Sequence, residues 1–322
     1  MKRPMKKILI WSSAALALIV VLSGSYVWYM YHSVEKTVAQ MYEPPVKPVY
    51  VSRDPEVKSK VKTKVEEAAV QKLDNREPFN VLVLGVDQRP NDRGRSDTMI
   101  VLTVNPAKQS ILMFNIPRDS RTEIIGRGSV DKINHAYAFG GVEMSLQTVE
   151  NFLDYPIDYY IKVNMEGFAR LIDLIGGVKV DNPFAFNYGG HEFKQGKLSL
   201  NGSEALLYSR MRFDDPKGDL GRNARQRAIL QEVMKSAMNV SNVTRIQDLL
   251  NEVGDSVKTD ITFEHMKKFV MEYRPAINRI DTVEIEGSGK KIGGIWYYIV
   301  TDAERTRIHN MIKDHMTTAI RT

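Results

Sequence analysis

The chain contains no cysteine among its 322 residues. That absence excludes disulfide bonds, thiolate metal sites and cysteine nucleophiles. A strong charge imbalance is also missing, because 45 basic and 39 acidic side chains leave a formal net charge of only +6. Apolar residues make up 43% of the chain and charged residues 26%. This is ordinary globular composition, which excludes a disordered chain and a polytopic membrane protein.

A long uncharged run occurs at the N-terminus. A basic tail, residues 1–7, precedes residues 8–31, which contain no charged side chain and end in aromatic residues. About 20 apolar residues span a bilayer, and aromatic residues are typical of its interface. We therefore predict a cytoplasmic tail at 1–7, a transmembrane anchor at 8–31 and a single-pass type II protein whose remainder lies outside the cytoplasm. A cleaved signal peptide is the alternative, but its apolar core is usually about 7–15 residues long.

Two further regions follow the anchor. Residues 32–78 contain three closely spaced prolines and a stretch of alternating charges, which predicts an extracytoplasmic stalk. Residues 79–322 are predicted to form one catalytic domain of the α/β class. Its central, mostly buried sheet would carry helices on both faces, as an α/β/α sandwich preceded by one transmembrane helix. The expected strands are 79–86, 98–104, 111–116, 159–163, 178–180, 282–286 and 296–300, and the expected helices are 142–153, 165–175, 203–207, 222–239, 243–253, 263–273 and 302–315.

The first candidate site is the loop between the first two strands. Three aspartates and three arginines lie between residues 87 and 97, and Asp87 directly follows a buried strand. Ligands of open α/β sheets bind beyond the carboxyl ends of strands. Two carboxylates with water suit Mg²⁺, although a solvated turn with paired charges is the alternative. Arg118 follows another buried strand and should emerge at the same edge.

The strongest candidate is the block from 208 to 227. Arg210 and Arg212 alternate and share one face if the segment is extended. On a helical wheel, Arg222 and Gln226 continue the core-facing stripe of the helix that follows. A charged residue in such a stripe needs a partner. That partner is either an anion at the helix N-terminus or a buried carboxylate such as Asp219 or Asp215.

Together these elements combine guanidinium groups with a pair of aspartates. Arginine binds phosphate oxygens bidentately, whereas aspartates repel phosphate unless a divalent cation lies between them. We therefore predict a pyrophosphate or phosphodiester bound with Mg²⁺ (or Mn²⁺). Lys132, Asn134 and His135 are weaker additions to the site, because a lone histidine in a loop is usually structural.

Four ordered motifs give the chain a family resemblance: LGVDQR…GRSDT, NIPRDS, DKINHAYAFGG and YSRMRFDDPKGDLGRNARQR. With these motifs the chain resembles the LytR-CpsA-Psr family of cell-wall glycopolymer ligases, and in particular the bacillar wall teichoic acid transferases. The motifs cover most of residues 79 to 237. Beyond residue 240 the sequence is less diagnostic. The family fold is an α/β/α sandwich with a hydrophobic pocket for a polyprenyl chain.

The resemblance implies roles for individual residues. Asp87 and Asp97 would ligate the metal, and Asp97, Arg118 and Arg222 would be the catalytic residues. Contacts to the substrate pyrophosphate would come from a set of polar residues that the family pattern places around the site: Arg89, Arg95, Arg118, Arg210, Arg212, Arg222 and Gln226.

The implied reaction is a phosphotransfer. A peptidoglycan sugar hydroxyl attacks a lipid-linked pyrophosphate, polyprenyl monophosphate leaves, and the glycopolymer, expected to be wall teichoic acid, is joined through a phosphodiester. Asp97 or Asp87 is a candidate for deprotonating the acceptor, although a metal-bound carboxylate is a poor base. The expected partners are the polyprenyl-pyrophosphate-linked polymer, peptidoglycan and membrane lipid, with no nucleic acid. Two alternatives remain open: a pyrophosphohydrolase acting on the same substrate, and a non-catalytic membrane-anchored regulator.

Overall fold

A mixed six-stranded sheet forms the centre of the protein, in the order β11-β6-β1-β2-β3-β12. The computed structural model describes residues 2–45, 50–58, 76–87, 93–237 and 254–317. Strands β1, β3, β6 and β12 run in one direction, because β1 pairs with β6 and β3 with β12 in parallel, while β2 is antiparallel to both β1 and β3. The strands of this sheet are β1 (Phe79–Val86), β2 (Ser96–Asn105), β3 (Ser110–Asn115), β6 (Tyr159–Asn164), β11 (Val257–Thr259) and β12 (Arg279–Val283).

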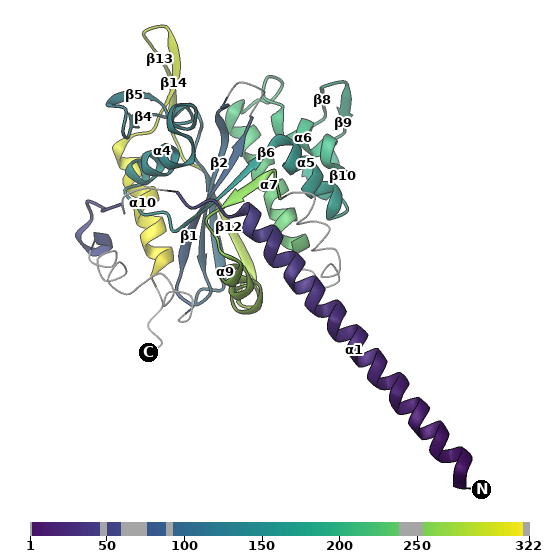
Figure 1. Cartoon of the computed structure of the whole chain (residues 1–322). Helices are drawn as coiled ribbons and strands as arrows, with labels where there is room; N and C mark the ends of the chain where they lie inside the picture. The colour runs from purple at the N-terminus through teal and green to yellow at the C-terminus, as the bar shows by residue number, and fades with distance from the viewer. Residues whose placement is uncertain (1, 46–49, 59–75, 88–92, 238–253, 318–322) are drawn as a thin grey trace.

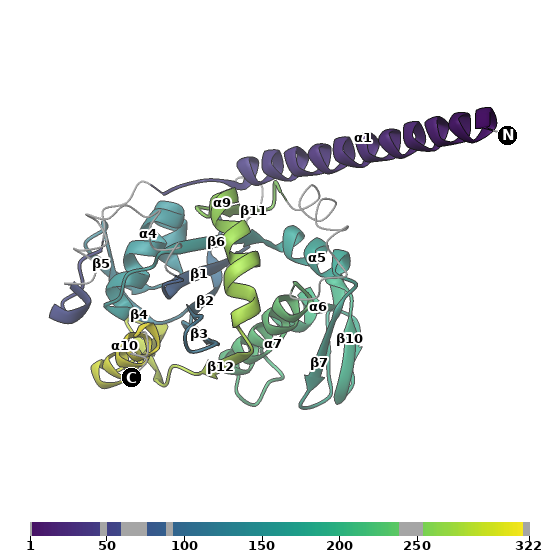
Figure 2. The ribbon, with the colours of Figure 1, turned by 90° about the horizontal axis from the view of Figure 1, so that it is seen from below.

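Helices cover both faces of this sheet (Figure 2). One face packs against α4 (His135–Leu153) and α10 (Asp302–Met316), where Leu82 and Leu84 of β1 are fully buried. The other face packs against α7 (Asp219–Ala237), α9 (Phe263–Lys268) and the π-helical turn η2 (Phe269–Tyr273), which leads into the short 3₁₀ turn η3 (Arg274–Ala276). Alternate residues of β1 enter the two cores because side chains of a strand alternate between faces. The predicted α/β/α sandwich is confirmed.

A smaller apolar core lies beside the sheet. It is built by α5 (Met165–Leu174), α6 (Gly202–Arg210) and the inner side of α7, and its fully buried side chains include Phe193 and Tyr208. The short strands around it are β7 (Val178–Asn182), β8 (Phe186–Tyr188), β9 (His191–Phe193) and β10 (Gly196–Leu200). Two further hairpins lie elsewhere: β4 (Arg121–Ile124) with β5 (Ser129–Lys132), and β13 (Ser288–Ile292) with β14 (Ile295–Ile299).

The structure differs from the sequence prediction mainly in its short elements. Strands β4, β5, β8–β11 and β13 were not predicted, because three to five residues carry little periodicity. The expected strand 282–286 lies earlier, at β12, and helix α4 begins at His135 rather than 142, with non-helical backbone at Gly140 and Gly141. The expected helix 263–273 is α-helical only to Lys268. The expected helix 243–253 lies outside the described residues.

The N-terminal helix α1 (Lys2–Met41) is a single element that extends away from the domain (Figure 1). Within the described residues, the segment Leu16–Met41 of this helix is long and apolar enough to cross a membrane. The helix continues past residue 31 into the predicted stalk. Directly after it, Tyr42 forms a parallel bridge with Thr259, and the Glu43 amide donates to the Thr259 carbonyl at 2.8 Å.

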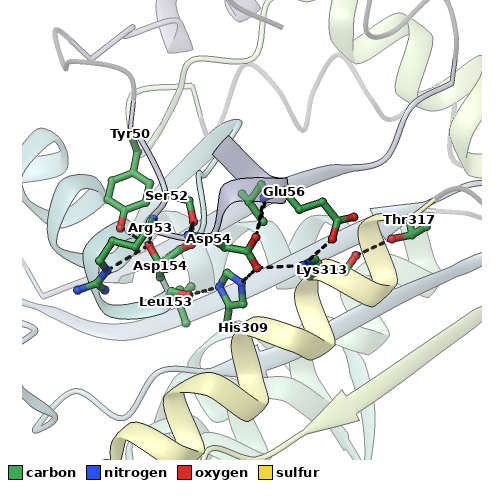
Figure 3. Close-up of polar contacts among 11 residues, drawn as sticks. Tyr50, Ser52, Arg53, Asp54, Glu56, Leu153, Asp154, His309, Lys313 and Thr317 are labelled. Carbon is green, nitrogen blue, oxygen red and sulfur yellow. Dashed lines mark hydrogen bonds and ion pairs between the residues drawn. The ribbon is translucent and has the colours of Figure 1, made fainter. Parts of the chain in front are cut away.

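Residues 50–57, also within the predicted stalk, pack on the domain as a strap (Figure 3). The Tyr50 hydroxyl donates to Asp154 at 2.8 Å. The Asp54 carboxylate lies 2.9 Å from Lys313 Nζ and 3.2 Å from His309 Nε2, both on α10. Val57 is 2% exposed and joins the core between α4 and α10. Residues 50–57 are therefore packed against the domain, and a stalk over the whole of residues 32–78 stays a prediction.

Candidate active site

The candidate site residues meet at one end of the sheet. Asp87 follows β1, Arg118 follows β3, and Asp97 lies at the beginning of β2. Because β2 is antiparallel to its two neighbours, its start lies beside their carboxyl ends. The Asp87 amide donates to the Arg95 carbonyl at 3.3 Å, which holds the two sides of the β1–β2 loop together. Sheet topology thus brings together three residues that are separated along the chain.

Asp97 lies at the centre of the polar cluster. Its Oδ2 is 3.0 Å from Arg118 Nη1, and its Oδ1 accepts a 2.9 Å hydrogen bond from the Asn134 amide. Arg118 is also 3.6 Å from Asp219. Burial alone would lower the pKa of Arg118, but the neighbouring carboxylates of Asp97 and Asp219 outweigh it and raise the pKa. Arg118 therefore stays positively charged and is held within the polar cluster by its ion pairs.

Arg222 is the most deeply buried of the predicted phosphate ligands. It is 6% exposed, and its Nη2 pairs with Asp219 at 2.9 Å one helical turn earlier on α7. Its Nε has no hydrogen-bond partner among the described residues. Burial lowers the pKa of Arg222 despite the attraction of Asp219. Arg222 thus pairs with a carboxylate, which was one of the two partners considered from the sequence. Its Nε still has a donor that a ligand could use.

The remaining predicted residues fall in different places. Arg210 is the last residue of α6 and not part of an extended segment, yet it lies 3.6 Å from Asp87. The Arg212 guanidinium lies over the Phe213 ring at 4.4 Å. Gln226 accepts a long hydrogen bond of 3.4 Å from Asn115. Arg89 lies outside the described residues.

An apolar pocket of about 410 Å³ opens beside this cluster. Its charged and amide lining includes Asp87, Asp97, Arg118, Arg210, Arg212, Arg222 and Gln226. The rest of its wall is largely aliphatic and aromatic and comes from β1, β2, β6, β8, α5, α6, α7 and the segment between α6 and α7: Val83, Ile100, Val163, Met165, Phe168, Leu171, Tyr188, Leu206, Phe213, Leu230 and Val233. We refer to this cavity as the apolar pocket. Its wall therefore combines a large apolar surface with several arginines.

A second cavity of about 680 Å³, here called the polar cleft, is also lined by Asp97 and Arg118. It shares four residues with the apolar pocket, namely Asp97, Arg118, Arg212 and Phe213. Its remaining wall comes from the loops around β4–β5, the segment before α7, and the β13–β14 hairpin: Arg95, Pro117, Asp119, Lys132, Asn134, His135, Asp215, Lys217, Gly218, Asp219, Leu220, Gly289, Trp296 and Tyr298. Phe213, which is 83% exposed, stands where the two cavities meet.

The donor set fits a divalent cation shared with a phosphate ligand. Asp87 and Asp97 line the same pocket, and each now pairs with an arginine. Among the described residues no group of three or more His, Cys, Asp or Glu side chains forms a cage. Mg²⁺ usually takes one or two carboxylates and completes its shell with water and substrate phosphates. Mg²⁺ binding by these two residues stays a prediction.

Some site residues were underestimated from the sequence. Asn134, treated as a weak addition, bonds directly to Asp97, and Lys132 lies 2.7 Å from Asp119. Trp296 and Tyr298 were read only as strand residues, although their alternation places both on one face of β14. No local sequence signal predicts that the β13–β14 hairpin, which lies far along the chain from Arg118, reaches this edge of the sheet. Chain folding alone brings it there.

A buried ion pair supports the segment between α6 and α7. The Arg225 and Asp215 side chains are 4% and 3% exposed and pair with each other. Arg225 also donates to the Tyr208 carbonyl at 3.0 Å. Arg227 of α7 is also buried, and it pairs with Glu284 at 2.8 Å. These two arginines make structural contacts, whereas Arg222 and Gln226 line the apolar pocket.

Comparison with known proteins places this geometry in a family. The model of the LytR_cpsA_psr family matches residues 45–314. The curated proteins named polyisoprenyl-teichoic acid--peptidoglycan teichoic acid transferase TagU include one from Bacillus licheniformis, 43% identical over 98% of both chains. The TagU of Bacillus subtilis is 42% identical over 98% of both chains.

Solved structures agree. The crystal structure of B. subtilis TagU superposes with a TM-score of 0.63 at 42% identity, covering 76% of this chain and all (100%) of that one. An Enterococcus faecalis protein described as a transcriptional regulator gives a TM-score of 0.69 at 36% identity, covering 76% and 89%. A structure of TagT bound to LIIa-WTA gives 0.64 at 26% identity, covering 75% and 91%. On its motifs, its fold and these matches, the chain belongs to the LytR_cpsA_psr family.

Proposed function

We propose that this chain is a phosphotransferase that moves a teichoic-acid-type glycopolymer from a polyprenyl-pyrophosphate carrier to a sugar hydroxyl of peptidoglycan. The observation that carries the proposal is the apolar pocket, whose lining combines a largely apolar wall with Arg118, Arg222 and the two aspartates. A polyprenyl chain matches the apolar wall, and a pyrophosphate matches the arginines. The TagU relatives bear the name of this activity.

The buried arginines provide electrostatic stabilisation. A pyrophosphate entering the pocket would replace the carboxylates as the partner of Arg118 and Arg222, and the free Nε of Arg222 supplies one donor. Fixed guanidinium groups in a partly desolvated site stabilise negative charge on a transferring phosphoryl group. Arg210, Arg212 and Gln226, which line the same pocket, would help to position this group.

In the covalent step, one oxygen–phosphorus bond forms and another breaks. The acceptor hydroxyl oxygen bonds to the phosphorus next to the glycopolymer, and the bond from that phosphorus to polyprenyl phosphate breaks. Polyprenyl monophosphate leaves with the electron pair, and the hydroxyl proton passes to water or to a carboxylate such as Asp97. A divalent cation on Asp87 and Asp97 would supply positive charge that screens the phosphate oxygens from these two carboxylates.

The N-terminal helix has a direct role in this proposal. A polyprenyl-linked substrate stays in the bilayer, so the enzyme that uses it works at the membrane surface. Helix α1 supplies a segment of suitable length and hydropathy. We infer that it anchors the protein with the N-terminus in the cytoplasm and the catalytic domain outside, as the basic residues before it indicate.

The test uses the full chain in detergent with a labelled lipid-linked polymer, with and without peptidoglycan. We expect label in the peptidoglycan fraction only when both substrates and Mg²⁺ are present. Arg118→Ala should abolish most of this transfer, whereas Arg170→Ala, a partly exposed arginine on α5, should not. Release of label only as free polymer phosphate, whether or not peptidoglycan is added, would identify a pyrophosphohydrolase instead.

A further inference from the structure

The polar cleft has an aromatic wall that the pyrophosphate chemistry does not use. Trp296 and Tyr298 of β14 line it, and both come from the β13–β14 hairpin, which projects beyond the end of the sheet beside β4 and β5 (Figure 1). The hairpin is joined to the site by a bridge between Ser120 and Tyr298, and the Tyr298 amide donates to the Asp119 carbonyl at 2.9 Å. Asp119 directly follows Arg118. The aromatic wall is thus anchored to the catalytic edge.

The Trp296 ring packs against a glycine of the neighbouring strand. A Cβ atom placed on Gly289 of β13 would overlap the indole, so only glycine at this position lets the ring lie across the neighbouring strand. Trp296 is nevertheless 51% exposed. A large aromatic ring that is packed on one face and exposed on the other offers an apolar surface in a cavity that also contains many charged and polar side chains. The C–H-rich face of a pyranose ring packs on such a surface, while its hydroxyls bond to polar neighbours.

The geometry of phosphoryl transfer indicates which substrate reaches the polar cleft. Attacking and leaving oxygens lie roughly in line across the phosphorus. In the proposed reaction the leaving oxygen belongs to polyprenyl phosphate, which occupies the apolar pocket. The attacking hydroxyl must therefore approach the phosphorus from outside the apolar pocket, and the polar cleft is a second cavity that Asp97 and Arg118 also line.

We propose that the polar cleft is the acceptor site and binds the glycan strand of peptidoglycan, with Trp296 packed against the face of one sugar ring. This inference rests on the proposed transferase function. The hydroxyl and amide groups of the glycan would meet polar side chains of the cleft, among them Lys132, Asn134 and His135. His135 is held in place by Asp131, 2.8 Å from its Nδ1. Trp296 acts as a binding residue and takes no part in bond making.

Binding can be measured without turnover. The chain has three tryptophans, at positions 11, 28 and 296. In the full-length Trp11→Phe/Trp28→Phe variant, fluorescence therefore reports on Trp296 alone. Titration with a soluble peptidoglycan glycan tetrasaccharide, which carries no pyrophosphate, should give a saturable change in intensity or emission maximum. Absence of any change at concentrations that support transfer would overturn the proposal.

Kinetics separate the acceptor from the donor. Trp296→Ala should raise KM for the peptidoglycan acceptor by about tenfold, the size expected for loss of one large aromatic contact. KM for the lipid-linked donor should stay unchanged, and Trp296→Phe should recover most of the loss. Gly289→Ala should reproduce the acceptor effect, because it displaces the ring while leaving it in the chain. Ile295→Ala is the matched control, since Ile295 is 50% exposed on the same strand but does not line the cleft.

The outcomes distinguish this inference from the transferase proposal. If the protein transfers polymer to peptidoglycan but Trp296→Ala has a normal KM for the acceptor, the acceptor site is refuted. The proposed transferase function is then unaffected. A raised donor KM with normal acceptor KM would assign the cleft to the sugars of the donor and refute the proposal as stated. If the wild type only hydrolyses the donor, the transferase proposal fails, and the fluorescence titration still decides whether the cleft binds glycan.

Discussion

At the scale of single residues, the site depends on arginines that are buried against carboxylates. Arg222 is 6% exposed and pairs with Asp219, while Arg118 lies between Asp97 and Asp219. Removing a partner from a buried charge is costly, so these carboxylates keep the cations in place in the absence of substrate. A phosphate ligand can then exchange with a carboxylate without leaving a guanidinium unpaired.

Arg222→Lys tests the need for a planar guanidinium. Lysine keeps the positive charge beside Asp219 but loses the fork that contacts two oxygens at once. We expect kcat/KM to fall by about 10- to 100-fold, corresponding to one charge-assisted hydrogen bond, with little change in the melting temperature. Steady-state transfer assays measure the first and calorimetry the second. Arg170→Lys on α5 is the control, and equal activity of the two variants would contradict a direct role for Arg222.

At the scale of elements, the segment between α6 and α7 positions the residues that we propose to bind phosphate. It is held by the Arg225–Asp215 pair and by the bond from Arg225 to the Tyr208 carbonyl. Gly221 lies against Asp215 so closely that a Cβ atom there would overlap the carboxylate. The bend that brings Arg212 and Arg222 to one pocket therefore rests on a buried ion pair.

Arg225→Met should be strongly destabilising. It leaves the Asp215 carboxylate buried without its cation, which costs about 3–5 kcal/mol. Denaturant unfolding of the full chain in detergent measures the change, and Asp215→Asn combined with Arg225→Met should recover part of it. Arg279→Met is the matched control, because its pair with Asp281 is largely exposed and should contribute at most about 1 kcal/mol. Similar losses in the two single variants would argue against a structural role for the buried pair.

At the scale of the whole molecule, the strap of residues 50–57 joins the membrane-proximal part to the domain. Asp54 carries this connection through Lys313 and His309 of α10 (Figure 3). The hydrogen bond from Lys313 holds the pKa of Asp54 well below its ordinary value of 3.8. A depressed carboxyl pKa means that the folded state favours the charged form, so the stabilisation is complete above the unfolded pKa and is lost as the pH falls through the folded one.

Asp54→Asn should therefore lower stability at neutral pH by about 1–2 kcal/mol, through the loss of charge-assisted hydrogen bonds. The difference in melting temperature between wild type and variant should be constant from about pH 7 to pH 5 and should shrink below about pH 4. Calorimetry over this range measures it. Glu56→Gln is the control, since Glu56 pairs with Lys313 but is 56% exposed. A difference that does not change with pH would contradict this role of Asp54.

The proposed topology makes a prediction at the same scale. The basic tail should keep the N-terminus in the cytoplasm, which places the C-terminus outside. A reporter enzyme that functions only outside the cytoplasm should therefore be active when it is fused after Thr322. Alkaline phosphatase activity of the fusion in whole cells measures this. A fusion that is active only as a cytoplasmic reporter would place the catalytic domain inside the cell and remove access to peptidoglycan.

Much of the fold could be predicted from the sequence. Continuous apolar runs identified β1, β2 and β3 nearly to the residue, and helical periodicity placed Arg222 and Gln226 on one stripe of α7. These signals are local, because a buried strand needs apolar side chains at consecutive positions and a helix needs them every third or fourth residue. The order and spacing of the motifs indicated the family, and the matches to known proteins confirm it.

Tertiary structure decided what no local pattern contains. The strap at residues 50–57 reads as a charged stalk, because its contacts lie about 100 and 250 residues further along the chain. The polar cleft depends on the β13–β14 hairpin reaching the end of β3, and the partners of Arg225 and Arg227 depend on how α7 packs. The sequence by itself determined the strands, the chemistry of the arginines and aspartates, and the apolar N-terminal run. Which of those groups face a common cavity was settled only by long-range packing, since burial and charge pairing are properties of the assembled fold.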